Sequence, residues 1–398
     1  MTPAIEVRPE AQIAADGRNN FGKRMAAATS TVDREDDSQW TSTIDFRKLM
    51  AMAGALYWLV TTVVVVPIAC TATAVMLFPL MLFSMKLFNK LEHALCVMVN
   101  DHWVGSGQYT GVTIEVYGDD INTIADKRAL CLVNHLGLVD HYCLMTAFHD
   151  KHSLTGRYLW VIFNIWKKTP LGVMWTTHGN FFINGGAAMR DRVLKSFREH
   201  LAKYYWRHDF GWVVMYPEGS RLFLIKDSEQ RFAAKNGIAP FKHCAHPRTG
   251  AAHAVLDVAG PSDNSLTDAK SGLGEPIEYI VDVTLGYPKG NVVSLGDAMV
   301  GEWPDNDSRI AMHYRIFKVT PELTDEPTLK EWLYERYAEK DQLLDDYYRT
   351  GVFPGPSKFV NFPQMRNVIV QFFWLSLFYL HYVFWIQPVT LYAASFFF

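Results

Sequence analysis

The sequence predicts an α/β protein in which a mixed sheet is flanked by helices and membrane helices lie near both ends of the chain. Short runs rich in Val, Ile and aromatic residues alternate with longer helix-like runs through the middle of the chain. Two long runs, Ala51–Met85 and Asn367–Phe398, contain no Asp, Glu, Lys or Arg. A mean hydropathy of −0.01 nevertheless excludes a chain that is mostly membrane-spanning.

The composition narrows the class of protein further. Of the 398 residues, 49% are hydrophobic and 20% are charged, which excludes a disordered or fibrous chain. A formal net charge of −3 supplies no basic field, so nucleic acid is not expected as a partner. Aromatic residues reach 14%, which indicates contact with lipid. The 5 cysteines form no C-x-x-C pair, so they support neither a disulfide framework nor a zinc site, and they indicate a reducing compartment.

Four segments are expected along the chain. Residues 1–50 are polar and mixed in charge, as a disordered tail is. Residues 51–85 form a membrane segment longer than the roughly 20 residues that one crossing needs. Because Pro67 and Pro79 interrupt it, a kinked helix and a tight hairpin both fit. Residues 86–366 form the folded domain with a C-terminal extension, and residues 367–398 form the second membrane segment. The cations that flank the first run are symmetric and leave the topology open.

The folded domain contains five expected strands and four expected helices. Gly, Asn, Asp or Pro bounds each strand, and a Ser-, Asp- and Gly-rich stretch at 261–274 is expected to be a loop. The expected strands are Gly111–Tyr117, Ala129–Val133, Trp212–Tyr216, Tyr279–Leu285 and Arg315–Val319, and the expected helices are Val139–Phe148, Met189–Trp206, Glu229–Asn236 and Leu329–Tyr348.

The first polar motif follows the strand Ala129–Val133, where His135 and Asp140 lie five residues apart. Positions i and i+5 diverge by roughly 140° on a helix, so the two side chains meet only if the chain turns between them, as Gly137 would permit. An imidazole that donates to a carboxylate is suited to take a proton from an alcohol. The pair indicates general-base chemistry, and a turn-capping His before a helix-heading Asp is the alternative.

A second motif, Tyr216-Pro-Glu-Gly-Ser-Arg221, also follows an apolar strand. Its arginine and its backbone N–H groups can face a phosphate, and a tight turn with a surface salt bridge is the alternative. A third stretch, Gly179-Asn-Phe-Phe-Ile183, has the pattern of a buried strand edge.

Taken in this order, the three motifs resemble the pattern of the glycerolipid acyltransferase family, which is N-H-x4-D, then G-x-x-F-I, then F-P-E-G-[ST]-R. All three blocks in the right order are rarely met by chance. The resemblance implies that His135 is the general base and that Asp140 orients it. It also implies phosphate binding by the second motif and further substrate contacts elsewhere. The implied substrate-binding residues are Asn134, Gly179, Phe182, Ile183, Glu218, Gly219, Ser220 and Arg221.

Within that family the chain is most similar to the lysophosphatidylglycerol acyltransferases, through stretches such as His178-Gly-Asn-Phe-Phe-Ile183 and Pro247-Arg-Thr-Gly-Ala251. This similarity implies transfer of an acyl group from acyl-CoA to the hydroxyl of lysophosphatidylglycerol. Lysophosphatidylethanolamine, lysophosphatidylinositol and lysophosphatidate are alternative acceptors. The implied partners are acyl-CoA, the lysophospholipid and a bilayer, with no cofactor and no metal. The implied location is the endoplasmic reticulum membrane, with the catalytic domain in the cytosol.

Two departures from the family pattern concern the substrate. Asn184-Gly185-Gly186 stands where the family usually has a basic residue, and the nearest cations are Arg190 and Arg192. Tyr216 replaces a Phe, and its hydroxyl would need a partner if it is buried.

Two other classes of function remain as alternatives. His149-x2-His152 and His243-x2-His246, together with His135 and His141, faintly resemble the boxes of a di-iron membrane desaturase, although no double-His box occurs. The departure at 184–186 would also suit a non-catalytic lipid-binding homologue. The presence of both His135 and Asp140 argues against that second alternative.

Overall fold

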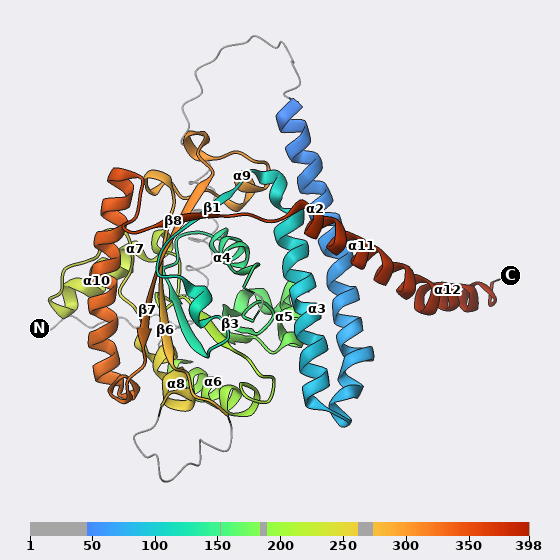
Figure 1. Ribbon diagram of the computed structural model, residues 1–398, viewed down its shortest axis with the longest axis horizontal. Coiled ribbons are helices and arrows are strands. Elements are labelled where there is room, and N and C mark those ends of the chain that lie inside the picture. The colour runs from blue at the N-terminus through green and yellow to red at the C-terminus, as the bar shows by residue number, and fades with distance from the viewer. Residues whose placement is uncertain (1–45, 152, 184–188, 262–273, 398) are drawn as a thin grey trace, which may run out of the picture. The chain divides into compact units, whose positions relative to one another are not determined.

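A mixed β-sheet forms the centre of the fold (Figure 1). The computed structural model describes residues 46–151, 153–183, 189–261 and 274–397, in which eight strands lie in the order β4-β3-β5-β2-β6-β7-β1-β8. The strands from β4 to β6 pair in parallel, whereas β6 with β7 and β1 with β8 pair antiparallel. The predicted α/β class with a mixed sheet is confirmed. The strands are β1 (Thr113–Gly118), β2 (Ala129–Val133), β3 (Tyr158–Phe163), β4 (Phe181–Ile183), β5 (Trp212–Met215), β6 (Tyr279–Gly286), β7 (Arg309–Lys318) and β8 (Ser357–Val360).

All five predicted strands are present, and β2 has the predicted bounds. β4 lies within the stretch that has the pattern of a strand edge. Strand β7 begins at Arg309, well before the predicted Arg315, because its first half pairs with the whole of β1. Strands β3 and β8 were not predicted. The expected loop at 261–274 lies almost entirely outside the described residues.

The helices cover both faces of the sheet. Three of the four predicted helices agree within a few residues with α4, α6 and α10, but α7 begins at Leu222 rather than at the predicted Glu229. The helices of the domain are α3 (Met85–Ser106), α4 (Asp140–Phe148), α5 (Pro170–His178), α6 (Arg190–Tyr204), α7 (Leu222–Asn236), α8 (Thr249–Ala259), α9 (Leu295–Met299) and α10 (Glu326–Thr350).

Strand β2 shows how the core is divided. Every residue of β2 is buried, and successive side chains point to opposite faces of the sheet. Cys131 and Val133 join the core formed with α3 and α4, whereas Leu130 and Leu132 join the core formed with α6 and α8. A strand that is buried on both faces has a continuous run of apolar residues in its sequence, which explains why the bounds of β2 could be predicted.

Two terminal segments are long and apolar enough to cross a membrane. The first covers Phe46–Leu82 and comprises α2 (Phe46–Thr71) and short π and 3-10 segments. The second covers Gln364–Ala394 and comprises α11 (Gln364–His381), a π segment and α12 (Gln387–Ala394). After the first segment the chain turns, Ser84 caps α3, and α3 runs back beside α2 (Figure 1).

Helix α11 is attached to α3 by polar contacts. Asp101 of α3 is fully buried, and Arg366 donates to its Oδ2 from Nε at 2.7 Å and also from a terminal nitrogen. The indole N–H of Trp374 donates to the carbonyl of Met98 at 3.1 Å. The second apolar segment is therefore bound to the folded domain at its beginning, whereas most side chains of α12 are exposed.

Candidate active site

The turn between β2 and α4 brings His135 and Asp140 together. Nδ1 of His135 lies 2.9 Å from Oδ2 of Asp140. The Asp140 side chain is fully buried, while 21% of the His135 side chain is exposed. The contact that the spacing requires is thus present, at the carboxyl end of β2.

Asp140 accepts four hydrogen bonds. Its Oδ2 also accepts from the backbone N–H of Leu136 at 2.7 Å and of Gly137 at 2.9 Å, and its Oδ1 accepts from the hydroxyl of Tyr287 at 2.6 Å. A carboxylate in the first turn of a helix is favoured by the helix dipole as well. The orientation of the carboxylate toward His135 is therefore fixed.

Gly137 is required at the turn for space. A Cβ there would lie 2.8 Å from Cγ1 of Val292 and 3.2 Å from the hydroxyl of Tyr287. Its φ does not fall in the left-handed region, so the turn that brings His135 and Asp140 together does not itself require the backbone freedom of a glycine there. Close packing against the loop after β6 explains the glycine.

The imidazole of His135 is held flat against the ring of Tyr216, with ring centroids 4.2 Å apart and planes 20° apart. If Nδ1 carries the proton and donates it in the hydrogen bond to Asp140, the other ring nitrogen, Nε2, is unprotonated and can accept a hydrogen bond. Among the described residues Nε2 has no hydrogen-bond partner. The hydroxyl of Tyr216 is buried and has no hydrogen-bond partner among the described residues, and burial raises its pKa well above the ordinary value.

Glu218 links the two motifs rather than facing solvent. Only 1% of it is exposed, and its two oxygens accept from the backbone N–H of His135 at 3.0 Å and of Ala245 at 3.2 Å. Burial raises the pKa of Glu218 to about 8, against the lowering effect of these two N–H groups. Both carboxylate oxygens are occupied, so Glu218 ties the β2–α4 turn to the loop before α8.

Two arginines lie at the loop after β5 without an ion pair among the described residues. Arg221 lies over the ring of Phe223, 5.1 Å from its centroid, and burial lowers its pKa while the charge of Asp140 opposes this shift. Arg248, which immediately precedes α8, lies against Gly219: a Cβ on that glycine, whose φ is +73°, would be 3.3 Å from Cδ of Arg248. The sequence motifs gave no role to Arg248, which stood only inside a stretch of family similarity.

The other predicted substrate-binding residues do not join this cluster. Asn134 is fully buried, and its amide exchanges hydrogen bonds with the backbone of Leu285 at 2.7 and 2.8 Å, which ties β2 to β6. Gly179 ends α5 in a left-handed conformation. Phe182 and Ile183 lie in edge strand β4, separated from β2 by β3 and β5. Asn184-Gly185-Gly186 lies outside the described residues.

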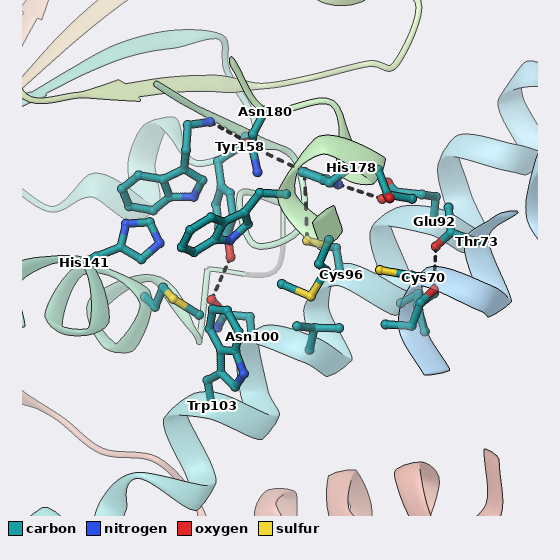
Figure 2. Close-up of a pocket in the computed structure, with 18 residues that line it drawn as sticks. Cys70, Thr73, Glu92, Cys96, Asn100, Trp103, His141, Tyr158, His178 and Asn180 are labelled. Atoms are coloured by element: carbon teal, nitrogen blue, oxygen red, sulfur yellow. Dashed lines mark hydrogen bonds and ion pairs between the residues drawn. The ribbon is translucent and has the colours of Figure 1, made fainter. Parts of the chain in front are cut away.

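A mostly apolar cavity lies beside the pair, between α3, α4, α5, β3 and the end of α2. Figure 2 shows His141 on one side of it and the His178–Glu92 ion pair, 2.7 Å between Nδ1 and Oε1, on the other. Burial lowers the pKa of His141 to about 4, to which His135 contributes and which Asp140 opposes. His141 is therefore neutral. It lines the cavity and follows Asp140 directly in the sequence, so the cavity lies next to the His135–Asp140 pair.

The described residues contain no group of three or more His, Cys, Asp or Glu that could hold a metal ion. The histidines of the suggested iron boxes have other partners: Nε2 of His149 lies 3.0 Å from the carbonyl of Asn361, His243 contacts Asp345, and His246 contacts Glu229. His152 lies outside the described residues.

Comparison with known proteins identifies the family. The sequence pattern described as Acyltransferase matches residues 113–268, and the pattern described as Acyltransferase C-terminus matches residues 305–374. A Caenorhabditis elegans protein provisionally named a 1-acyl-sn-glycerol-3-phosphate acyltransferase, acl-12, is 49% identical over 372 residues, which cover 93% of this chain and 95% of that protein. The chain belongs to the glycerolipid acyltransferase family.

The chain is also similar to two other proteins. Mouse acyl-CoA:lysophosphatidylglycerol acyltransferase 1 is 30% identical over 331 residues, which cover 81% of this chain and 87% of that protein. The crystal structure of the 1-acyl-sn-glycerophosphate acyltransferase PlsC from Thermotoga maritima covers 75% of this chain and 98% of its own, at 12% identity and a TM-score of 0.43. The resemblance predicted from the sequence is confirmed, and the protein is an acyltransferase rather than a desaturase or a non-catalytic homologue.

Proposed function

We propose that this acyltransferase transfers a fatty acyl group from acyl-CoA to the free hydroxyl of lysophosphatidylglycerol. The observation that carries the proposal is the geometry of His135, whose Nδ1 is engaged by Asp140 while Nε2 is left without a partner among the described residues. The donor and acceptor are those in the name of the mouse relative. Lysophosphatidate is the second candidate acceptor, because the worm relative has the higher identity and a name of that class.

In the proposed reaction, Nε2 of His135 takes the proton of the lysolipid hydroxyl as its oxygen attacks the thioester carbonyl. The tetrahedral intermediate collapses, the carbon–sulfur bond breaks, and the imidazolium returns the proton to the departing CoA thiolate. Asp140 stabilises the imidazolium during this step. The backbone N–H groups of Ser220 and Arg221, which donate to no carbonyl among the described residues, are the proposed donors to the oxyanion. No covalent enzyme intermediate and no cofactor are involved.

Arg221 and Arg248 are the proposed phosphate ligands. Both guanidinium groups lie at the Gly219–Arg221 loop without a carboxylate partner among the described residues. A guanidinium presents paired N–H donors that match the oxygens of a phosphodiester. Arg248 would supply the cation that the family has after Phe182-Ile183 and that this sequence lacks. Glu218, with both oxygens engaged by backbone N–H groups, would position the loop rather than contact the phosphate.

The cavity next to His141 is the proposed site of the acyl chain. Its lining includes Met145, Met174, Trp160 and Trp175, and it borders α2, which belongs to the first apolar segment. Its volume of about 50 Å³ is smaller than a long acyl chain. The flexible Met145 and Met174 side chains would therefore move when a chain enters. Removing an acyl chain from lipid costs about 0.8 kcal/mol per CH₂, so a site beside the membrane segments favours both substrates.

We propose that the enzyme resides in the endoplasmic reticulum membrane with its catalytic domain on the cytosolic side. The two apolar terminal segments support membrane association. The cytosolic side gives direct access to acyl-CoA.

The test is an assay of the purified full-length protein with labelled acyl-CoA and a panel of lysophosphatidylglycerol, lysophosphatidate, lysophosphatidylinositol and lysophosphatidylethanolamine. Highest kcat/KM with lysophosphatidylglycerol is expected, and a preference for lysophosphatidate would transfer the assignment to that acceptor. The variant His135→Ala is expected to lose transfer while retaining its elution volume in detergent. His208→Ala, on the opposite edge of the sheet, serves as the matched control. Turnover by His135→Ala at the wild-type rate would refute the general-base role.

A further inference from the structure

A second polar site lies at the amino ends of the parallel strands, at the opposite end of these strands from His135. A hollow of about 570 Å³ is formed by the first two turns of α3 and by the segments that lead into β3 and β5. The catalytic residues follow the carboxyl ends of parallel strands, whereas this hollow lies at their amino ends. We name it the basal hollow. It is lined by Lys86, Asn89, Lys90, His93, Arg157, Trp206 and Asp209.

The basal hollow is electropositive, although the whole chain has a net charge of −3. Lys86 and Lys90 lie one turn apart on α3, and neither has an ion pair among the described residues. Among the described residues that line the hollow, the only carboxylate belongs to Asp209, and it is shared by Arg128 at 3.0 Å and Arg157 at 2.9 Å. Two lysines are therefore available to an anion, and their spacing suits a phosphate between two ammonium groups.

Asn89 adds a buried acceptor that lacks a donor. Its amide nitrogen donates to the carbonyl of Arg207 at 2.9 Å, which fixes the orientation of the amide. Only 8% of Asn89 is exposed, and its Oδ1 has no hydrogen-bond partner in the part of the chain that the structure describes. Nε2 of His93, on the next turn, has no hydrogen bond among the described residues, although it lies 3.9 Å from Oε2 of Glu92. Because a buried polar atom without a partner is costly, the hollow fits a ligand that carries a hydroxyl beside its anionic group.

The surroundings of the hollow indicate a lipid rather than a soluble anion. Leu82 and Phe83, in the turn that precedes α3, are 86% and 85% exposed. Leu87 and Leu91 of α3 are exposed as well, next to the two lysines. Apolar side chains beside lysines are typical of a surface that lies at the boundary between acyl chains and head groups. The turn follows directly on the first apolar segment, at the lower end of α3 in Figure 1.

We propose that the basal hollow binds the head group of an anionic phospholipid that carries hydroxyls, with phosphatidylglycerol as the probe. The phosphate lies between Lys86 and Lys90, and a head-group hydroxyl donates to Oδ1 of Asn89. This lipid is bound as a ligand and is not turned over there, because the hollow and His135 lie at opposite ends of the parallel strands. The proposal does not depend on which lysolipid is acylated.

The experiment measures thermal unfolding of the full-length protein in neutral detergent during titration with dioctanoyl phosphatidylglycerol. Dioctanoyl phosphatidylcholine and dioctanoyl phosphatidate are titrated in parallel. We expect stabilisation by phosphatidylglycerol at the lowest concentration, by phosphatidate at a higher one, and none by phosphatidylcholine. The double variant Lys86→Gln/Lys90→Gln is expected to weaken phosphatidylglycerol binding at least tenfold. The control Lys195→Gln/Lys318→Gln removes the same charge from exposed positions and should leave binding unchanged.

Two further variants separate this site from the active site. Arg221→Gln/Arg248→Gln should impair acyl transfer and retain stabilisation by phosphatidylglycerol, whereas Asn89→Ala should abolish the preference for phosphatidylglycerol over phosphatidate. Equal losses in the Lys86/Lys90 and Lys195/Lys318 variants would overturn the proposal, as would loss of binding only in the Arg221/Arg248 variant. Stabilisation by glycerol 3-phosphate at the concentration at which the lipid acts would identify a soluble phosphate ester as the ligand and reject the lipid.

Discussion

The hydroxyl of Tyr287 lies 2.6 Å from Oδ1 of Asp140, on the side of the carboxylate opposite to the atom that faces His135. The tyrosine comes from the end of β6, 147 residues further along the chain. Asp140 is thereby held from two separate segments, its own turn and the loop after β6. This relationship gives Tyr287 a positioning role in the proposed mechanism.

The variant Tyr287→Phe should lower kcat about tenfold or more, since a hydrogen bond to a charged group contributes about 1.5–3 kcal/mol. The pH–rate profile should change as well, because the hydrogen bonds that Asp140 accepts determine how it holds the imidazolium. Kinetics across pH check this expectation. Tyr347→Phe, which removes a buried hydroxyl that has no hydrogen-bond partner within the described ranges, is the matched control. A profile identical to that of the wild type would exclude the positioning role.

The variant Asp140→Asn should reduce kcat by roughly 10⁴-fold, as loss of the orienting carboxylate does in a Ser-His-Asp triad. An amide nitrogen would face at least one of the donors that now converge on Asp140. Single-turnover measurements separate this loss from substrate binding, which should change little. A loss confined to KM would show that Asp140 acts in binding instead.

Glu218 should make the stability of the protein depend on pH. Its folded pKa of about 8 lies above the ordinary value of 4.5, so the folded state binds the extra proton between these values. The contribution to stability is complete below about pH 4.5 and is lost as the pH rises through about 8. Glu218→Gln should remove this part of the pH dependence. It should also cost about 1–3 kcal/mol, because an amide NH₂ meets one of the two backbone donors. Melting temperatures of both proteins from pH 5 to 9 test this, and parallel curves would contradict it.

Arg221→Gln and Arg248→Gln should each raise KM for the lysophospholipid about 10- to 100-fold, because each removes a charge-assisted hydrogen bond to the phosphate. Transfer to a monoacylglycerol, which lacks the phosphate, should be unaffected. Arg231→Gln, at an exposed position of α7, controls for the loss of charge. If both acceptors suffer equally, the arginines do not recognise the phosphate.

Met174→Trp should shorten the acyl chains that the enzyme accepts, because the larger ring fills part of the cavity beside His141. The ratio of kcat/KM for octanoyl-CoA to that for palmitoyl-CoA measures the effect and should rise about tenfold. Val173→Trp, on the neighbouring exposed position of α5, should leave the ratio unchanged. An unchanged ratio in Met174→Trp would place the acyl chain elsewhere.

Local patterns predicted the parts of the fold that local interactions specify. The bounds of β2 followed from a fully buried apolar run, and α10 followed from its composition. Strand β8 could not be predicted, because its four largely exposed residues are a strand only through pairing with β1. The start of α7 was also missed: the N–H of Leu222 bonds to the carbonyl of His135, a contact that no neighbouring residue reveals.

The residues of the candidate site also divide into those that local sequence predicts and those that only distant contacts bring there. The spacing of His135 and Asp140 predicted their contact, because a single turn contains both residues. Tyr287, Ala245 and Arg248 reach the site from other elements, and nothing in their local sequence indicates it. Glu218 was expected at the phosphate, but its isolated motif could not reveal that two backbone donors would occupy both oxygens.

The attachment of α11 to α3 has a consequence for attempts to obtain a soluble enzyme. Deleting the last apolar helices removes Arg366 and leaves the carboxylate of Asp101 buried without its cation. This loss would lower the free energy of unfolding by about 3–5 kcal/mol. The hydrophobic tail is thus not a detachable anchor. A shortened chain needs a neutral residue such as Asn at position 101 before it can be expected to fold.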